Sequence, residues 1–322
     1  MTAPLTLIDI GRPARADLPT VTLTIDGHPV SVPQGSTILK AAAGLGIAIP
    51  TLCFLETLNP VNVCRLCVVE VEGARVLVPS CARAVEAGMV VQTRSPRVVH
   101  ARRIVLELLA SSVDLSTAPG MADLLLEYAC TPERYGPPAP PSGARDVAIA
   151  GHHEAPAAEY AATVAQPVKV DNDLYVRDYG KCVLCYKCVQ ACGTDYQNTF
   201  AIAVAGRGFD ARISTEFAVA LPDSACVYCG NCIAVCPTGA LMARSEHELR
   251  VRGEWDEARQ TSGDTICPYC GVGCTLRLHV QDGAIVKATS PFDNDITRGN
   301  LCIKGRFGFE HVQSRRPPPA EQ

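Results

Sequence analysis

Sixteen of the 17 cysteines in this chain of 322 residues fall into four sets of four, and the spacing within each set suits a metal centre. In a chain this long, tight CxxC pairs indicate metal ligation in a reducing compartment better than they indicate disulfides. The sequence therefore predicts several redox centres along one chain. The sets are Cys53, Cys64, Cys67 and Cys81; Cys182, Cys185, Cys188 and Cys192; Cys226, Cys229, Cys232 and Cys236; and Cys267, Cys270, Cys274 and Cys302.

The second and third sets form an internal repeat. Both read C-x2-C-x2-C-x3-C, and each cysteine of the second set recurs 44 positions later in the third. This is the spacing of bacterial two-cluster ferredoxins, in which the fourth cysteine of each run binds the cluster of the other run. Zinc bound by four cysteines is the alternative. We therefore predict two [4Fe–4S] clusters with crossed ligands, namely Cys182, Cys185, Cys188 and Cys236 for one, and Cys226, Cys229, Cys232 and Cys192 for the other.

The first set lies in a stretch with strand and turn signals. Apolar residues alternate on both sides of Asp26-Gly27, a pair that favours a tight hairpin turn. Ser36 is placed to cap a short helix that ends near Gly44 or Gly46. A second hairpin is expected over residues 69–78. Two hairpins around one helix predict a β-grasp ferredoxin fold.

The spacing of the first set, C-x10-C-x2-C-x13-C, has a longer first gap than the C-x4-C-x2-C of plant-type ferredoxins. This gap, together with the segments NVCRLCVVEVEG and VPSCAR, resembles the N-terminal [2Fe–2S] domain of the large iron–sulfur subunit of respiratory complex I and its soluble relatives. The resemblance implies a [2Fe–2S] cluster on the four cysteines of this set, and structural zinc is the alternative.

The fourth set reads C-x2-C-x3-C-x27-C, a spacing that by itself also suits zinc. Its surroundings, TICPYCGVGC and GNLCIKGRFGF, resemble the N-terminal [4Fe–4S] segment of molybdenum- or tungsten-dependent formate dehydrogenases of the bis-pterin oxidoreductase family. The resemblance extends from about residue 21 to residue 312 and includes GRGFDARIS and EWDEARQ. It implies a third [4Fe–4S] cluster here and places Lys304 between that cluster and a pterin cofactor. A surface lysine near a cluster is the alternative for Lys304.

The chain departs from these families in two ways that change the expected number of clusters and the expected place of the catalytic site. Complex I relatives carry a His-x3-Cys-x2-Cys-x5-Cys motif after the [2Fe–2S] domain, whereas the stretch before Cys130 has no cysteine. We expect this cluster to be absent and Cys130 to act as a buried small hydrophobic residue. The sequence also stops at PPPAEQ, where the pterin-binding region of the formate dehydrogenase family begins. The resemblance therefore implies a catalytic site on a partner subunit and none on this chain.

The remaining segments complete an α+β architecture of three cluster-binding domains. Ile104, Val105, Leu108 and Leu109 predict one apolar helix face, which residues 124–126 continue. A Pro-, Ala- and Gly-rich stretch indicates a linker in which His152 and His153 are exposed. The predicted division is 1–20, an N-terminal extension; 21–97, a β-grasp [2Fe–2S] domain; 98–130, a helical segment; 131–168, a linker; 169–250, a two-[4Fe–4S] ferredoxin domain with strand-like runs in its insert; and 251–322, a small [4Fe–4S] domain of the molybdopterin oxidoreductase type with a hairpin at Asp282-Gly283.

Charge and missing motifs exclude several functions. The formal net charge is −4, and four oxidised clusters held by deprotonated thiolates would add roughly −8. Nucleic acid is disfavoured as a partner because no basic stripe offsets this charge. No G-x-G-x-x-G motif or P-loop indicates nucleotide binding. No signal peptide pattern or apolar stretch of membrane-spanning length is evident, which predicts a cytoplasmic protein that has no membrane partner.

These observations predict an electron-transfer iron–sulfur subunit of a cytoplasmic formate dehydrogenase complex, linked to NAD. It would carry one [2Fe–2S] and three [4Fe–4S] clusters, about fourteen irons per chain. Its expected partners are a molybdenum or tungsten bis-pterin catalytic subunit and a flavoprotein that binds FMN and NAD. A diaphorase-type subunit of a soluble NAD-reducing hydrogenase is the first alternative. A zinc-stabilised interaction scaffold is an alternative of another class.

Overall fold

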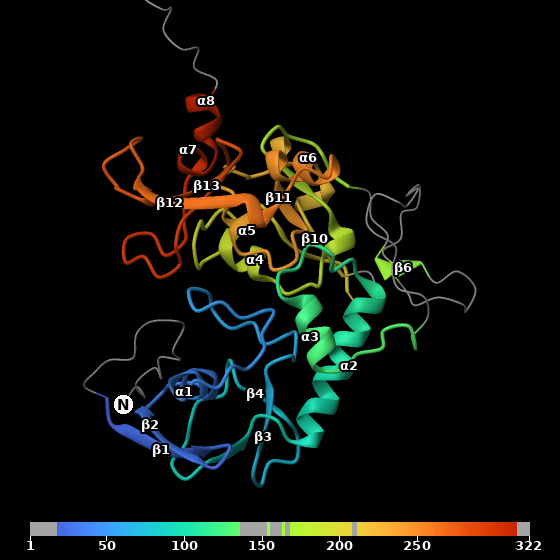
Figure 1. Ribbon diagram of the computed structural model, residues 1–322, viewed down its shortest axis with the longest axis vertical. Coiled ribbons are helices and arrows are strands. Elements are labelled where there is room, and N and C mark those ends of the chain that lie inside the picture. The colour runs from blue at the N-terminus through green and yellow to red at the C-terminus, as the bar shows by residue number, and fades with distance from the viewer. Residues whose placement is uncertain (1–17, 136–152, 155–162, 165–167, 208–210, 314–322) are drawn as a thin grey trace, which may run out of the picture. The chain divides into compact units, whose positions relative to one another are not determined.

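The computed structural model describes residues 18–135, 153–154, 163–164, 168–207 and 211–313, and its secondary structure is of mixed α+β type (Figure 1). The chain forms two compact units. Unit 1 comprises the chain up to residue 166 together with Gly180–Lys187. Unit 2 comprises Pro167–Tyr179 and the chain from Cys188 onward.

A five-stranded sheet with the order β2-β1-β5-β3-β4 forms the base of unit 1. The β1–β2 hairpin turns at Asp26 and Gly27, whose φ angles of 49° and 82° are both left-handed, as a two-residue hairpin turn requires. This hairpin and the pairing of β3 with β4 confirm the two predicted hairpins. The sequence analysis missed β5, which pairs parallel to β1 and antiparallel to β3. The strands are β1 (Thr20–Ile25), β2 (His28–Pro33), β3 (Val68–Val71), β4 (Val78–Pro79) and β5 (Val90–Gln92).

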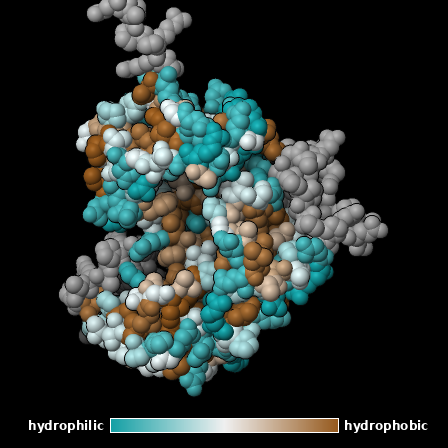
Figure 2. Space-filling model, viewed as in Figure 1, coloured by the Kyte–Doolittle hydropathy of each residue, from teal (hydrophilic) through white to brown (hydrophobic). Residues whose placement is uncertain are grey.

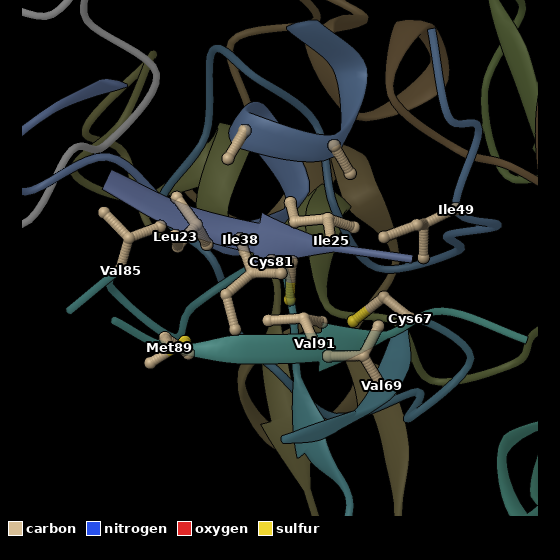
Figure 3. Close-up of a cluster of buried hydrophobic side chains, with 12 residues drawn as sticks. Leu23, Ile25, Ile38, Ile49, Cys67, Val69, Cys81, Val85, Met89 and Val91 are labelled. Carbon is tan, nitrogen blue, oxygen red and sulfur yellow. The ribbon is translucent and has the colours of Figure 1, made fainter. Parts of the chain in front are cut away.

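Helix α1 (Ile38–Gly44) packs its buried Ile38 against this sheet. The prediction that Ser36 caps this helix was wrong. Thr37 is the N-cap, because its backbone is extended and its hydroxyl accepts a hydrogen bond from the Lys40 N–H at 3.3 Å. Figure 3 shows Cys67 and Cys81 among the aliphatic side chains of this core. Two cysteines of the first set are therefore part of the hydrophobic core.

The predicted helical segment of unit 1 is confirmed as α2 (Pro96–Ser112) and α3 (Met121–Glu127). Its predicted apolar face is confirmed in part, because Val105, Leu109, Leu124 and Leu125 pack against a core cluster, whereas two other residues of that face do not. Leu108 is 47% exposed and Leu126 is 79% exposed. The buried stripe of α2 instead includes Arg102, whose guanidinium donates to the Tyr128 hydroxyl and to the Val68 carbonyl oxygen, both at 2.8 Å. Hydropathy does not identify this face because the packed side chain is charged.

Unit 2 contains short strands and helices around the cysteine runs. Strand β8 (Tyr175–Arg177) pairs antiparallel with β11 (Leu241–Ala243), and β9 (Ala203–Ala205) pairs with β10 (Arg212–Ser214), which confirms the strand-like runs predicted in the insert. Its helices are α5 (Asn231–Ala234) and α6 (Arg244–Val251), and its 3-10 turns are Glu216–Ala218, Leu221–Asp223 and Glu257–Arg259. Helix α4 (Lys187–Cys192) and the 3-10 turn Tyr179–Lys181 each include residues of both units.

The C-terminal part of unit 2 is an antiparallel sheet with the order β12-β13-β14, followed by two short helices. The predicted hairpin is present and turns at Asp282 and Gly283, whose φ angles are 52° and 80°. Strand β12 was missed because nearly all of its residues are exposed and polar, so it lacks alternation. The elements are β12 (Gln260–Ile266), β13 (Thr275–Gln281), β14 (Ala284–Thr289), α7 (Ile303–Phe307) and α8 (Phe309–Gln313).

Only part of the predicted linker lies within the described residues. There, β6 (His153–Glu154) pairs antiparallel with β7 (Thr163–Val164), whereas His152 lies outside the described residues. Across the described ranges, no helix has both the length and the apolar composition needed to cross a membrane. On the face shown in Figure 2, hydrophobic and hydrophilic residues are interspersed.

A buried ion pair in unit 1 fixes the start of the first ferredoxin run. Lys181 donates to the Asp114 carboxylate at 2.5 Å, and the backbone N–H of Asp114 donates to the Gly180 carbonyl oxygen at 3.1 Å. Burial opposes ionisation of Asp114. Hydrogen bonds from Lys181 and from the hydroxyl and backbone N–H of Ser116 nevertheless lower its pKa to about 2. The segment just before Cys182 is thus attached to the end of α2.

We expect Asp114→Asn to destabilise unit 1 by about 2 kcal/mol at neutral pH, the free energy that the lowered pKa represents. Because the pKa is lower in the folded state, this contribution is present above about pH 4 and is lost as the pH falls toward 2. Thermal unfolding of both proteins between pH 2 and 7 checks this, with exposed Asp123→Asn as the control. A difference that persists at pH 2 would contradict the ion-pair account.

Candidate iron–sulfur sites

The first set of cysteines gathers at one end of the unit 1 core. Cys53 is hydrogen-bonded to Cys64, and Cys67 is hydrogen-bonded to Cys81. Within each pair, the thiol of one cysteine stabilises the thiolate of the other. This lowers the pKa of Cys64 to about 5 and that of Cys67 to about 7, and it raises the pKa values of Cys53 and Cys81. The thiolates of Cys53, Cys64 and Cys67 also act on Cys81, so the structure brings the whole set together.

Local hydrogen bonds hold the two halves of this set in place. Both the backbone N–H and the hydroxyl of Ser80 donate to the Cys67 carbonyl oxygen, at 3.2 Å and 2.8 Å. Arg65, between Cys64 and Cys67, has a left-handed backbone with a φ of 58°. A non-glycine residue in this conformation costs free energy, so the surrounding contacts must maintain the turn.

Cys192 lies with Cys226, Cys229 and Cys232 in unit 2. Burial raises the pKa of the Cys232 thiol well above its ordinary value, and the negative charges of Cys229, Cys192 and Cys226 raise it further. This is the grouping that the crossed assignment requires, because Cys192 comes from the other run. The role of these residues as cluster ligands remains a prediction.

The remaining ferredoxin set is divided between the units. Cys182 and Cys185 belong to unit 1, whereas Cys188 and Cys236 belong to unit 2. Their assignment to one cluster therefore also remains a prediction.

The two ferredoxin runs share one local backbone geometry. Leu184 and Tyr228, which lie 44 positions apart, have left-handed φ angles of 51° and 55°. Their backbone N–H groups donate to Cys182 Sγ and to Cys226 Sγ, each at 3.4 Å. Hydrogen bonds of this kind favour the thiolate form and tune a bound cluster. The sequence repeat is thus also a structural repeat.

The fourth set includes Cys302, the N-cap residue of α7. The backbone N–H of Cys267 donates to the Cys274 carbonyl oxygen at 2.8 Å. Burial raises the pKa of Cys274, and the thiolates of Cys267, Cys270 and Cys302 raise it further, so all four cysteines of the set lie together. Cys270 and Cys302 are exposed.

Lys304 lies on α7, and its side chain is exposed. Its predicted contact with a pterin remains untested. Arg306, one half-turn further along α7, is buried.

The donor groups around the Cys226 site fit an anionic cluster. A cavity is lined by Cys192, Cys226, Cys229 and Cys232 together with Tyr175 and Arg177. The Tyr175 hydroxyl lies 3.0 Å from Cys226 Sγ. Arg177 is 1% exposed, and its Nε and one Nη have no hydrogen-bond partner within the described structure. Buried donors of this kind require an acceptor, and four thiolates around a cubane would supply negative charge there.

The sequence analysis missed Tyr175, Arg177, Asn231 and Arg306. Only Arg306 had a usable signal, its position four residues after Cys302. In the described ranges, no three His, Cys, Asp or Glu side chains have an arrangement that would hold a single metal ion.

The comparisons with known families identify three iron–sulfur domains. Residues 19–96 match the 2Fe-2S iron-sulfur cluster binding domain. Residues 181–240 match the 4Fe-4S dicluster domain, and residues 261–314 match the molybdopterin oxidoreductase Fe4S4 domain. The predicted fold class is therefore confirmed.

Relatives over most of the chain are oxidoreductase and hydrogenase subunits. An NADH-quinone oxidoreductase subunit of Rhizobium meliloti is 32% identical over 92% of this chain and 32% of its own length. The NADP-reducing hydrogenase subunit HndD of Solidesulfovibrio fructosivorans is 41% identical over 91% of this chain and 46% of its own. A putative formate dehydrogenase of Staphylococcus aureus is 24% identical over 91% of this chain and 31% of its own length. The chain thus spans about a third to a half of the length of these relatives.

Among solved structures, an NAD+-reducing [NiFe]-hydrogenase in the H2-reduced state is similar to this chain. The TM-score is 0.55 at 25% sequence identity, over 70% of this chain and 87% of that one.

Cys130 belongs to none of the four cysteine sets. It is half-buried beside Leu106 and Tyr128, and its Sγ lies 3.9 Å from the Arg103 carbonyl oxygen. This placement agrees with the expected hydrophobic role.

We expect Cys192→Ala and Cys226→Ala to remove the same [4Fe–4S] electron paramagnetic resonance (EPR) signal, because both thiols belong to one site. Cys130→Ala should leave the iron content unchanged. EPR spectra and iron analysis of the three variants check this. Loss of two different signals from the two ligand variants would show that the crossed assignment is wrong.

Proposed function

We propose that the chain is the iron–sulfur electron-transfer part of a cytoplasmic, NAD-linked formate dehydrogenase complex. It would connect a molybdenum or tungsten bis-pterin catalytic subunit with a flavoprotein that binds FMN and NAD. The observation that carries this proposal is the match of residues 261–314 to a molybdopterin oxidoreductase Fe4S4 domain, on the same chain as a [2Fe–2S] and a dicluster domain. The similarity to a putative formate dehydrogenase supports the choice of substrate.

The ligand sets proposed for the four clusters are those predicted from the sequence, with the domain boundaries given there. The bound clusters would accept and release electrons one at a time. The chain's own residues hold the thiolates, donate hydrogen bonds to sulfur and exclude water from Cys81. Lys304 is proposed to face the pterin of the catalytic subunit from α7.

A hydrogenase or an NADPH-linked complex is the second candidate. The 41% identity to an NADP-reducing hydrogenase subunit favours it, as does the similarity to an NAD+-reducing hydrogenase structure. In either case the chain would transfer electrons between a catalytic partner and a nicotinamide-linked partner.

Reduction of the native complex by different donors separates these candidates. The complex is purified anaerobically from its own cells, and its EPR signals are recorded after addition of formate, of hydrogen, and of NADH or NADPH. The proposal expects reduction by formate and by NADH, with a molybdenum- or tungsten-containing subunit in the complex. Reduction by hydrogen without any response to formate would overturn the formate assignment and support the hydrogenase alternative.

Cys302→Ala tests whether the Cys267 site lies on the electron path between the catalytic partner and the flavoprotein. This cysteine belongs to the site proposed to face the catalytic partner, so the variant should lose one [4Fe–4S] signal and most formate-to-NAD turnover. NADH should still reduce the other clusters, because they are reached from the flavoprotein side. Unchanged turnover would show that this site lies off the electron path.

A further inference from the structure

Arg306 lies between two cysteine sites of unit 2. Its Nε donates to the Cys229 carbonyl oxygen at 2.9 Å, and one Nη donates to Asn231 Oδ1 at 3.0 Å. Its helix starts directly after Cys302. The backbone N–H of Arg306 donates to the Cys302 carbonyl oxygen at 3.0 Å, so the residue contacts one cysteine of the Cys226 site and one of the Cys267 site.

The surrounding backbone is shaped to admit this side chain. Gly230 has a left-handed φ of 68°, and a Cβ there would lie 2.2 Å from Arg306 Cδ. Only glycine lets the arginine pass at this distance. Asn231 Oδ1 also accepts a hydrogen bond from the Leu301 N–H at 3.0 Å, which ties the approach to α7 to the start of α5. Phe307, the next residue, stacks on Tyr175 with ring centroids 6.4 Å apart.

Within the part of the chain that the structure describes, the charge of Arg306 has no carboxylate partner. The side chain is 4% exposed, and no Asp or Glu among the described residues forms an ion pair with it. Its two hydrogen-bond acceptors, a backbone carbonyl and an amide, are neutral. A guanidinium keeps its proton in proteins, so Arg306 is positively charged at neutral pH. A buried charge without a counter-ion is strongly unfavourable, so an anionic partner is required.

We propose that Arg306 is a counter-ion shared by two [4Fe–4S] clusters, one on Cys192, Cys226, Cys229 and Cys232 and the other on the Cys267 set. A fixed positive charge near a cluster favours the reduced state, which is more negative by one charge, and so raises the reduction potential. When one electron moves between the two sites, one cluster is oxidised, the other is reduced, and no bond or proton moves. The total negative charge facing Arg306 is then unchanged. The inference rests on cluster binding at both sites and not on the identity of the partner.

Potentiometric EPR titration of the full chain with its clusters tests this proposal. Arg306→Gln removes the charge, Arg306→Lys keeps it, and Arg259→Gln removes an exposed charge before β12, at the opposite end of that strand from Cys267. Signals are assigned with Cys192→Ala and Cys302→Ala. At a fixed solution potential, Arg306→Gln should lower the reduced-to-oxidised ratio of both clusters by roughly tenfold, a shift of about 59 mV for one electron. Arg306→Lys and Arg259→Gln should change both ratios far less.

Several results would overturn the proposal. Unchanged potentials in Arg306→Gln, or a shift at only one cluster, would show that the charge is not shared. Loss of iron from both Arg306 variants would assign the residue a packing role instead. If only Arg306→Gln fails to bind iron, the Arg306→Lys variant provides the test. Near-wild-type reduction potentials of both clusters in Arg306→Lys would support the role of the positive charge, and strongly shifted potentials would contradict that role. A wild-type chain without iron signals would overturn the cluster assignment itself, which is a different failure from intact clusters with unmoved potentials.

Discussion

The structure depends on bringing cysteine side chains close together, some of them in the hydrophobic core and some nearer the surface. Cys81 and Cys67 lie in a hydrophobic core, and Cys232 is half-buried beside three other cysteines. Burial and like charge both oppose ionisation of these thiols, so four thiolates at one point require strong positive compensation. Iron supplies most of that charge in an iron–sulfur protein, and the chain supplies the rest through N–H donors and buried arginines.

The backbone responds to this constraint in the same way at several sites. Leu184, Tyr228 and Arg65 adopt left-handed conformations that L-residues rarely take, and each lies within a cysteine run. At Leu184 and Tyr228 this conformation accompanies backbone N–H groups that donate to the sulfur of Cys182 and of Cys226. In unit 2 the same requirement explains Gly230 beside Cys229 and the buried Arg306, which forms no ion pair with a carboxylate among the described residues. Packing, backbone geometry and electrostatics thus all help to place cysteine side chains close together.

The sequence allowed prediction of features with a strict period or spacing. Cysteine spacing identified the four sets, and Asp-Gly turns located both long hairpins. Prediction from the sequence failed where tertiary contacts determine the local structure. Thr37 replaces Ser36 as a cap because of its backbone angles, and the buried face of α2 carries Arg102 in place of Leu108. Tyr175 could not be assigned, because its partner Cys226 lies 51 positions away in the chain. Such contacts leave no local pattern.

The central claim is that the four cysteine sets hold redox clusters and not single ions. Anaerobic purification of the chain, followed by analysis of iron, acid-labile sulfide and zinc, tests it most directly. The account predicts a brown protein with about fourteen irons and as many sulfides per chain, from one [2Fe–2S] and three [4Fe–4S] clusters. A colourless protein that holds zinc and no labile sulfide would contradict it.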